Sequence, residues 1–414
     1  MKKTTLLALG VVTAVSVATS KPCDAAFVIG GENGWQLSTD GIVDVFATYN
    51  STTKGPGPGH SLSLLSVGGN EATADQRFGI GIGLLPSVVA FNVKAPTTNG
   101  VDSAVRVGIY PAIQNKGGTR FDTSPNIDFR EFFFTAKGAY GELLAGRALN
   151  LYQGKNILND MTLLTAGVVP GPAFRGNTTL GHIGYGYLYT NFGPQIRYTT
   201  PDLAGTKIAI AVGEPYKISA DTGKTNSPRV ETEISYAKTF GSTSVQAWAS
   251  GLYQTAPRSD AAAARPGKDN QSIGGAGGVS AGFIGVNMMF SGYGGKGLGM
   301  VSAQDGDFLG STSTDAAGKE RTHWGFLAQA TYKLTPSVML GVNYGQSRQE
   351  QSDYDKTDKT ISQIKNQEAG VATVTYNLNK FTQFIAEYSY AQNTWHDSAK
   401  QHSNQFALGT MFYW

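Results

Sequence analysis

The sequence has little of what disulfide-stabilised, helical membrane or disordered proteins need. It contains one cysteine, Cys23, among 414 residues, so no disulfide can form within the chain. After the N-terminus there is no apolar run of the roughly 20 residues that a transmembrane helix requires. Charged residues are scarce at 15%, yet aromatic residues reach 11%, which excludes the composition of a disordered chain.

Glycine and aromatic residues are abundant instead. The 53 glycines are about 13% of the chain, against an average near 7%, and they show no collagen period. The chain also has 20 Phe and 19 Tyr. A composition that is rich in glycine and aromatics, poor in cysteine and moderately polar favours an all-β protein, as a sandwich, a propeller or a membrane barrel.

The N-terminal segment has the pattern of a secretory signal peptide. Lys2 and Lys3 precede a short apolar run over residues 6–17, and small residues follow up to Ala26. We expect cleavage after Ala25 or Ala26, so residues 1–26 form the signal peptide and residues 27–414 a single domain. A membrane anchor is the alternative, but the apolar run is short for one.

The mature chain is close to neutral. Loss of residues 1–26 removes three of the 33 basic residues and one of the 30 acidic residues, which leaves a net charge of about +1. Binding to nucleic acid needs a concentrated basic face, so the sequence argues against a nucleic-acid partner.

Side chains alternate with a period of two along many segments. In 405–414, Phe406, Leu408 and Phe412 fall on one face, whereas Gln405 and Met411 fall on the other. The same alternation recurs in 229–239, 243–254, 321–333, 337–347 and 381–392. A strand of this kind turns one row of side chains toward lipid and the other toward a lumen.

The connections between these segments differ in length in a regular way. Short connections are expected at 137–141, 200–206, 240–242, 334–337 and 378–381. Long polar connections are expected at 51–76, 149–194, 214–229, 255–278, 303–320, 346–365 and 393–403. Short turns at one end and long loops at the other are typical of an outer-membrane barrel and have no reason to occur in a sandwich.

The pattern predicts a transmembrane antiparallel β-barrel of sixteen strands, with eighteen as an alternative. The predicted strands are 35–49, 77–93, 101–113, 127–137, 140–147, 195–201, 206–213, 229–239, 243–254, 279–290, 297–303, 321–333, 337–347, 366–377, 381–392 and 404–414. Pro86 cannot donate to a sheet, so it must lie at a bulge or an edge within its strand.

Five segments resemble the general trimeric porins of Gram-negative outer membranes. They are Arg77–Gly79, Arg130–Arg147 (REFFFTAKGAYGELLAGR), Tyr198–Gly205 (YTTPDLAG), Tyr376–Tyr390 and the terminal Phe412–Trp414. The resemblance implies a homotrimer in the bacterial outer membrane, in contact with its lipid and lipopolysaccharide. It also implies that the barrel-assembly machinery reads the strand ending at Trp414, and that no cofactor is needed.

The resemblance further implies that the loop over 149–194 folds into the lumen and forms a constriction. This loop carries Lys155, Asp160 and Arg175, and its apolar part, 161–169, is suited to pack on the inner wall. An ordinary outer loop is the alternative.

Family members place an arginine cluster opposite that loop. The candidates are Arg77, Arg106, Arg130, Arg147 and Arg197. Alternation turns Arg106 inward, because an arginine facing lipid near the midplane costs about 2–4 kcal/mol. Adjacent Arg130 and Glu131 require either a bulge or a face that meets another subunit. Salt bridges at the rim or contacts with lipopolysaccharide are the alternative roles of these arginines.

The sequence therefore predicts a porin for passive diffusion of ions and small hydrophilic solutes, with a weak preference for anions that rests on the arginines. A substrate-specific channel, for instance for small organic acids, is the alternative. An outer-membrane enzyme is disfavoured, because none of the five histidines has zinc-helix spacing and three lie in predicted loops. No acidic segment has the pattern of a calcium loop, so no metal is implied.

Overall fold

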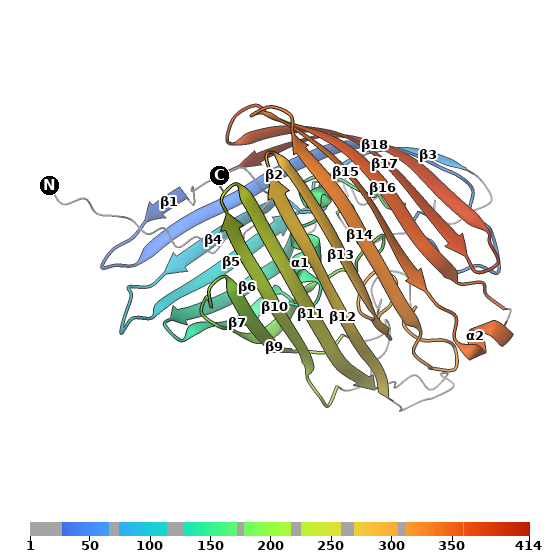
Figure 1. The fold of residues 1–414 in the computed structure, drawn as a ribbon, viewed down its shortest axis with the longest axis horizontal. Coiled ribbons are helices and arrows are strands. Elements are labelled where there is room, and N and C mark those ends of the chain that lie inside the picture. Colours follow the sequence, from blue (N-terminus) through green and yellow to red (C-terminus); the bar gives the residue numbers. More distant parts are fainter. Residues whose placement is uncertain are drawn as a thin grey trace.

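The strands of the computed structural model form one antiparallel sheet that curls into a barrel (Figure 1). The structure describes residues 27–65, 74–113, 127–171, 178–216, 225–257, 269–304, 312–358 and 360–414. The predicted signal peptide, residues 1–26, and the predicted constriction residue Arg175 lie outside these ranges.

The described strands follow one another around the barrel. They are β1 (Phe27–Gly30), β2 (Gln36–Thr52), β3 (Asp75–Gly81), β4 (Val88–Lys94), β5 (Asp102–Pro111), β6 (Ile127–Gly138), β7 (Gly141–Leu149), β8 (Phe192–Thr199), β9 (Thr206–Gly213), β10 (Arg229–Phe240), β11 (Thr243–Pro257), β12 (Asp269–Phe283), β13 (Val286–Lys296), β14 (Thr322–Lys333), β15 (Val338–Gln349), β16 (Ile364–Asn377), β17 (Thr382–Trp395) and β18 (Lys400–Tyr413). Each strand from β4 to β17 pairs with the next, and β18 pairs with β2, which closes the ring.

Strands β2 to β18 fill sixteen positions around the barrel wall. The strands β3 and β4 both pair with β2, at its two ends, and so occupy one position. The short β1 pairs with the N-terminal end of β2, at the short-turn end of the barrel, and is not part of the ring. The predicted sixteen-stranded barrel is therefore confirmed, and the two further strands are this division and this addition.

Three short helices accompany the strands in the described ranges. They are α1 (Gly154–Leu158), the 3-10 helix η1 (Met161–Leu164) and α2 (Asp353–Thr357). No helix in the described part of the chain is long and apolar enough to cross a membrane.

The last strand shows why these sequences form a barrel wall. Phe406, Leu408 and Phe412 are 54%, 66% and 49% exposed, whereas Gln405 and Met411 are buried. The exposed row can face hydrocarbon, and the buried row faces the interior. The alternation predicted for 405–414 is thus confirmed.

The interruption between β3 and β4 bends the chain away from the wall. Residues 82–87, which include Pro86, pair with neither neighbouring strand. The Asp44 carboxylate accepts hydrogen bonds from Gly83 N and from Ser87 Oγ, the latter at 2.7 Å. Leu84 N donates to the carbonyl of Thr165, a residue of the long loop after β7, at 3.1 Å. Pro86 therefore lies at a break in the sheet, as its missing N–H requires.

The predicted strands over 279–290 and 297–303 are wrong. The structure has β12 and β13 instead, joined at Ile284 and Gly285, which both have positive φ. Residues 274–278 are mostly glycine, so no side-chain alternation marks them as a strand. Backbone hydrogen bonds alone define them as one, and the predicted long loop over 255–278 is correspondingly shorter.

Loop lengths are otherwise divided between the two ends as predicted. Short turns join the strands at 139–140, 200–205, 241–242, 284–285, 334–337 and 378–381. The predicted long connection at 393–403 is an exception, because β17 and β18 continue to Trp395 and from Lys400.

Candidate constriction of the lumen

The loop between β7 and β8 folds into the barrel. Its described parts are 150–171 and 178–191, and together they are called the lumen loop here. The wall residues that hydrogen-bond to it include Glu231, Trp248, Ser250, Gln329, Asn343, Ser347, Gln367, Glu387 and Gln405. These residues belong to β10, β11 and β14–β18, so the loop follows the inner wall over much of its circumference. The alternative of an ordinary outer loop is excluded.

Apolar packing adds to these hydrogen bonds. Leu163, Ala166 and Val168 are buried, and Ala166 clusters with the wall residues Ile385 and Met411. The predicted packing of 161–169 on the inner wall is therefore present in the structure. Burial of such side chains stabilises the loop by about 25 cal/mol for each Å² of apolar surface.

One wall glycine is needed for this close approach. A Cβ atom on Gly345 of β15 would lie 2.2 Å from the Tyr185 carbonyl oxygen and 2.9 Å from His182 Nδ1. Any larger residue would displace the loop backbone. His182 is itself buried, and its Nε2 lies 2.8 Å from Asn343 Oδ1, so it has a structural contact.

The loop begins at a buried ion pair. Glu231 Oε2 accepts hydrogen bonds from the backbone N–H groups of Leu151 at 2.7 Å and Tyr152 at 3.1 Å. Arg229 Nε lies 3.0 Å from Glu231 Oε1, and the two side chains are 2% and 3% exposed. The guanidinium also lies over the Tyr216 ring, at 4.4 Å from its centroid. Alternation indicates that Glu231 faces inward, but it does not indicate this role, which needs the folded loop.

Arg106 faces inward, as its neighbours predict, but carboxylates surround it. Its Nη1 and Nη2 donate to Asp40 at 2.9 and 3.1 Å, and its Nε donates to Glu131 at 2.7 Å. Tyr110 donates a further hydrogen bond to Glu131 at 2.6 Å. The group therefore has one positive and two negative charges, so Arg106 adds no net positive charge to the wall.

A bulge in β6 explains the neighbouring residues Arg130 and Glu131. Gly108 pairs with Glu131 and Tyr110 pairs with Asp128, so three steps in β6 match two steps in β5. The extra residue lets both side chains turn inward. Arg130 Nε donates to Asp128 at 2.7 Å, and its guanidinium lies over Tyr110. Of the two predicted explanations, the bulge is correct.

The prediction that Arg147 lines the constriction is wrong. Leu144 and Ala148 of β7 are buried on the inner face, and Arg147 alternates with them on the exposed outer face. Its Nη1 donates to the Phe192 carbonyl at 2.6 Å. A motif ending in Gly-Arg shows where a strand lies, but its last side chain here faces away from the lumen.

Asp160 lies in the lumen loop but does not face open space. It is fully buried and accepts hydrogen bonds from Thr162 N, Thr162 Oγ1 and Tyr187 Oη at 2.9, 2.6 and 2.7 Å. Burial, together with the adjacent carboxylate, raises the pKa of Tyr187 well above its ordinary value, so this phenol remains a donor. Asp160 therefore caps η1 instead of lining a passage.

Within the described ranges, four of the predicted cations have no ion pair: the outward-facing Arg147, and Lys155, Arg197 and Arg77. Arg197 of β8 donates one long hydrogen bond, 3.4 Å, to the Leu149 carbonyl, and its Nε has no partner. Lys155 of α1 is half-buried, and Glu233 of β10 interacts electrostatically with both cations. Arg77 is exposed and lies opposite Asn50. The structure thus brings Lys155, Arg197 and Glu233 together and leaves Arg77 apart.

A barrel of sixteen strands with one long loop folded inward is the architecture of a diffusion channel. The family model for Gram-negative porins matches residues 4–397, and the chain belongs to this family. No curated protein matches the sequence.

Solved structures share the fold. The outer membrane channel DcaP of Acinetobacter baumannii has a TM-score of 0.65 at 15% identity, and the match covers 93% of this chain and 99% of that one. The anion-selective porin from Comamonas acidovorans has a TM-score of 0.62 at 14% identity, with coverage of 92% and 100%. The trimer form of OmpT of Vibrio cholerae has a TM-score of 0.51 at 13% identity, with coverage of 92% and 100%. The protein is thus an outer-membrane channel for small solutes, located in the bacterial outer membrane.

The buried pair at the start of the lumen loop leads to a stability prediction. Glu231→Gln leaves the Arg229 charge buried without a partner, and breaking such a pair costs about 3–5 kcal/mol. We expect a lower urea midpoint for unfolding in detergent and larger fluctuations of single-channel current. Glu233→Gln is the matched control, two residues along the same face and half-buried. Equal effects of the two substitutions would contradict the anchoring role of Glu231.

Proposed function

We propose that the protein conducts ions and small hydrophilic solutes by passive diffusion, between the lumen loop and the wall it does not cover. The observation that supports this most strongly is the seated lumen loop. A barrel of this size is too wide for its wall side chains to fill, so it holds water, and the loop narrows it. Selection is then by solute size and by the electric field of the lining charges.

The proposed weak preference for anions rests on Lys155 and Arg197. Arg106 and Arg130 are matched by carboxylates at 2.7–2.9 Å, and Arg147 faces outward. Glu233 interacts electrostatically with both cations, and Glu142 and Glu231 also act on Arg197, so the proposed preference is a weak one. The same pair would suit a carboxylate, so a channel specific for small organic acids is the second candidate.

We also propose that the protein is not an enzyme, so that it makes and breaks no covalent bond in its solutes. Residues 278–282 (GVSAG) match the Gly-x-Ser-x-Gly spacing of hydrolase nucleophiles, but they lie inside β12. A nucleophile elbow needs a sharp turn from strand to helix. Ser280 is instead within hydrogen-bond distance of Asn287 on the adjacent strand, at 3.2 Å.

The proposed assembly is a homotrimer of the chain 27–414 after removal of residues 1–26. Exposed apolar side chains on β3 and β6, such as Phe78 and Phe132, are available for subunits or lipid. The trimer form of the Vibrio cholerae protein supports the same arrangement. We further propose contacts with outer-membrane lipid and lipopolysaccharide, and recognition of β18 and Trp414 by the barrel-assembly machinery.

The channel proposal predicts a specific change in ion selectivity. In a planar bilayer with a salt gradient, the combined Lys155→Gln and Arg197→Gln protein should lose its anion preference. The permeability ratio should fall roughly fivefold, since a unit charge nearby acts with about 1 kcal/mol in water. Arg147→Gln should leave the reversal potential unchanged, because that residue faces outward. An unchanged potential in the double variant would refute the role of Lys155 and Arg197, and a silent bilayer would refute the channel.

Processing and assembly can be measured on the same material. Protein extracted from outer membranes should begin at Ala26 or Phe27 by N-terminal sequencing. Before heating, it should migrate in SDS at about three times the mass of the heated chain. A mature protein that retains Lys2 and Lys3, or one that migrates as a monomer under all conditions, would contradict the corresponding proposal.

A further inference from the structure

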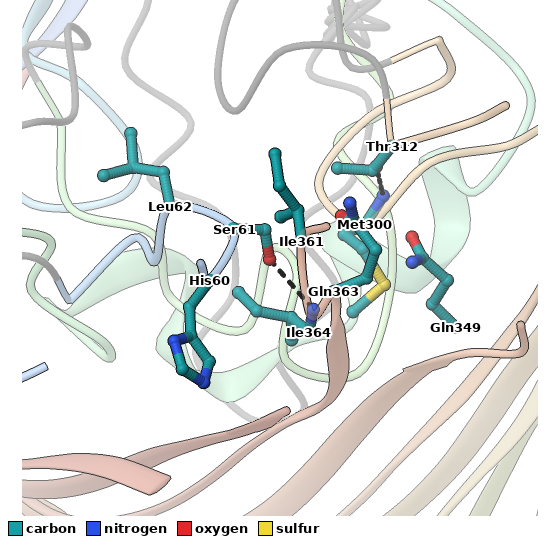
Figure 2. A pocket seen from close by; sticks show the side chains of 9 residues that line it. All are labelled: His60, Ser61, Leu62, Met300, Thr312, Gln349, Ile361, Gln363 and Ile364. Atoms are coloured by element: carbon teal, nitrogen blue, oxygen red, sulfur yellow. Dashed lines mark hydrogen bonds between the residues drawn. The ribbon is translucent and has the colours of Figure 1, made fainter. Parts of the chain in front are cut away.

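Three segments meet at the long-loop end of the barrel and enclose a pocket of about 290 Å³ (Figure 2). They are Gly59–Leu62 after β2, Met300 and Thr312 between β13 and β14, and residues 361–363 just before β16; Gln349 at the end of β15 also lines the pocket. We call it the outer pocket; the side chains that matter to its chemistry are Ser61, Leu62, Met300, Gln349, Ile361 and Gln363. None of these residues belongs to the constriction.

Hydrogen bonds hold the first and third segments together. Ser61 N donates to the Ser362 carbonyl at 2.9 Å, and Ser362 N donates to the Gly59 carbonyl at 2.7 Å. Ser61 Oγ accepts from Ile364 N at 3.0 Å, and its carbonyl accepts from the buried Trp395 indole at 3.1 Å. The pocket is thus formed by a folded surface and not by the chance approach of loose loops.

The second segment is fixed by a buried arginine. Arg321 makes a two-pronged ion pair with Asp355 of α2, with both nitrogen–oxygen distances at 2.7 Å. Its Nη1 also donates to the carbonyls of Thr312 and Thr314, at 3.2 and 2.7 Å. Thr312 Oγ1 in turn accepts from Met300 N at 3.0 Å. Asp355 therefore neutralises the Arg321 charge, and the hydrogen bonds of Arg321 hold Thr312 in place at the pocket.

The lining offers no free charge to a ligand. His60 is its one titratable side chain, and both ring nitrogens are already engaged. Its Nε2 lies 2.7 Å from Asp397 Oδ2, and its Nδ1 lies 3.2 Å from the Gly57 carbonyl. Trp395 contacts the ring edge to face. An ionic solute would thus lose water at this site without gaining a partner of opposite charge.

Polar and apolar groups are both available. The Gln363 amide makes no hydrogen bond to a described residue, and Gln349 has one contact, between its Oε1 and His323 Nε2 at 3.2 Å. Leu62 and Ile361 are 45% and 50% exposed beside them. Aliphatic groups that are open to water in the same pocket as the unengaged Gln363 amide suit a solute with hydroxyl or amide groups on one edge and an aliphatic group on another.

We propose that the outer pocket is a binding site for small uncharged solutes that carry hydroxyl and amide groups together with an aliphatic group. This inference deepens the proposed function and rests on it, since it gives the channel a solute class that it gathers at its mouth. The proposed preference for anions arises at the constriction, whereas the outer pocket selects solutes by hydrogen bonding and apolar contact.

The test uses N-acetylglucosamine, which has hydroxyl groups, an amide and a methyl group and is uncharged. Calorimetric titration into the signal-processed protein in detergent should show saturable binding. Gln363→Leu should weaken it about tenfold, as expected for one lost hydrogen bond. Ile361→Trp should abolish it by filling the pocket. Ile284→Trp makes the same change in an exposed turn at the other end of the barrel and should bind like the unmodified protein.

Two comparison solutes define the chemistry. Glucose lacks the amide and should bind more weakly, and N-acetylneuraminate carries a carboxylate and should not bind. Absence of saturable binding by N-acetylglucosamine, or binding that is unchanged in Ile361→Trp, would overturn the proposal. Conductance recorded from the same preparation separates the two failures: a conducting protein without binding refutes the outer pocket alone, whereas binding without conductance refutes the channel.

Discussion

Closure of the hydrogen-bonded ring is the constraint on which the rest of this structure depends. Hydrocarbon offers no partner to a backbone N–H or C=O, so strands can cross a bilayer only when every edge is paired. Here β18 pairs with β2 and completes the ring. Closure fixes the alternation of lipid-facing and lumen-facing side chains, and the number of strands fixes a lumen too wide for those side chains to fill.

A chain that folds into this lumen brings its own backbone groups with it, and wall side chains satisfy many of them. Glu231 accepts from Leu151 N and Tyr152 N, and Glu387 accepts from Gly167 N. Gln405 accepts from Val169 N. Acidic and amide side chains on the inner wall therefore serve largely to seat the loop, which leaves few of them to act on a passing solute.

The inward-facing arginines are likewise engaged by other residues of the protein. Arg106 and Arg130 face inward, yet each is held by a carboxylate on a neighbouring strand or in its own strand. The field in the lumen therefore depends on the few cations that have no such partner. The number of inward arginines is a poor guide to selectivity, because an arginine such as Arg106 is paired by carboxylates on other strands, Asp40 and Glu131.

A structural feature could be predicted from the sequence when it depends on neighbouring residues, and not when it depends on distant ones. The alternation in 405–414 and the short turns depend on neighbouring residues, and the sequence predicts both. The β12 strand could not be predicted, because its glycines carry no pattern. The sequence limits the adjacent Arg130 and Glu131 to two explanations, a bulge or a subunit contact. It cannot choose between them, because the bulge depends on the register of β6 with β5. The contacts of Asp160 and Glu231 depend on how the lumen loop folds, which no local pattern reveals.

The position of the lumen loop has a consequence for the order of assembly. Its hydrogen bonds reach Gln405 on β18 and the backbone of Leu84 after β3, so they lie on both sides of the seam where the first and last wall strands meet. These partners come together only after β18 has paired with β2. Seating of the loop is therefore a late step in biogenesis, and the passage acquires its final width after the wall is complete.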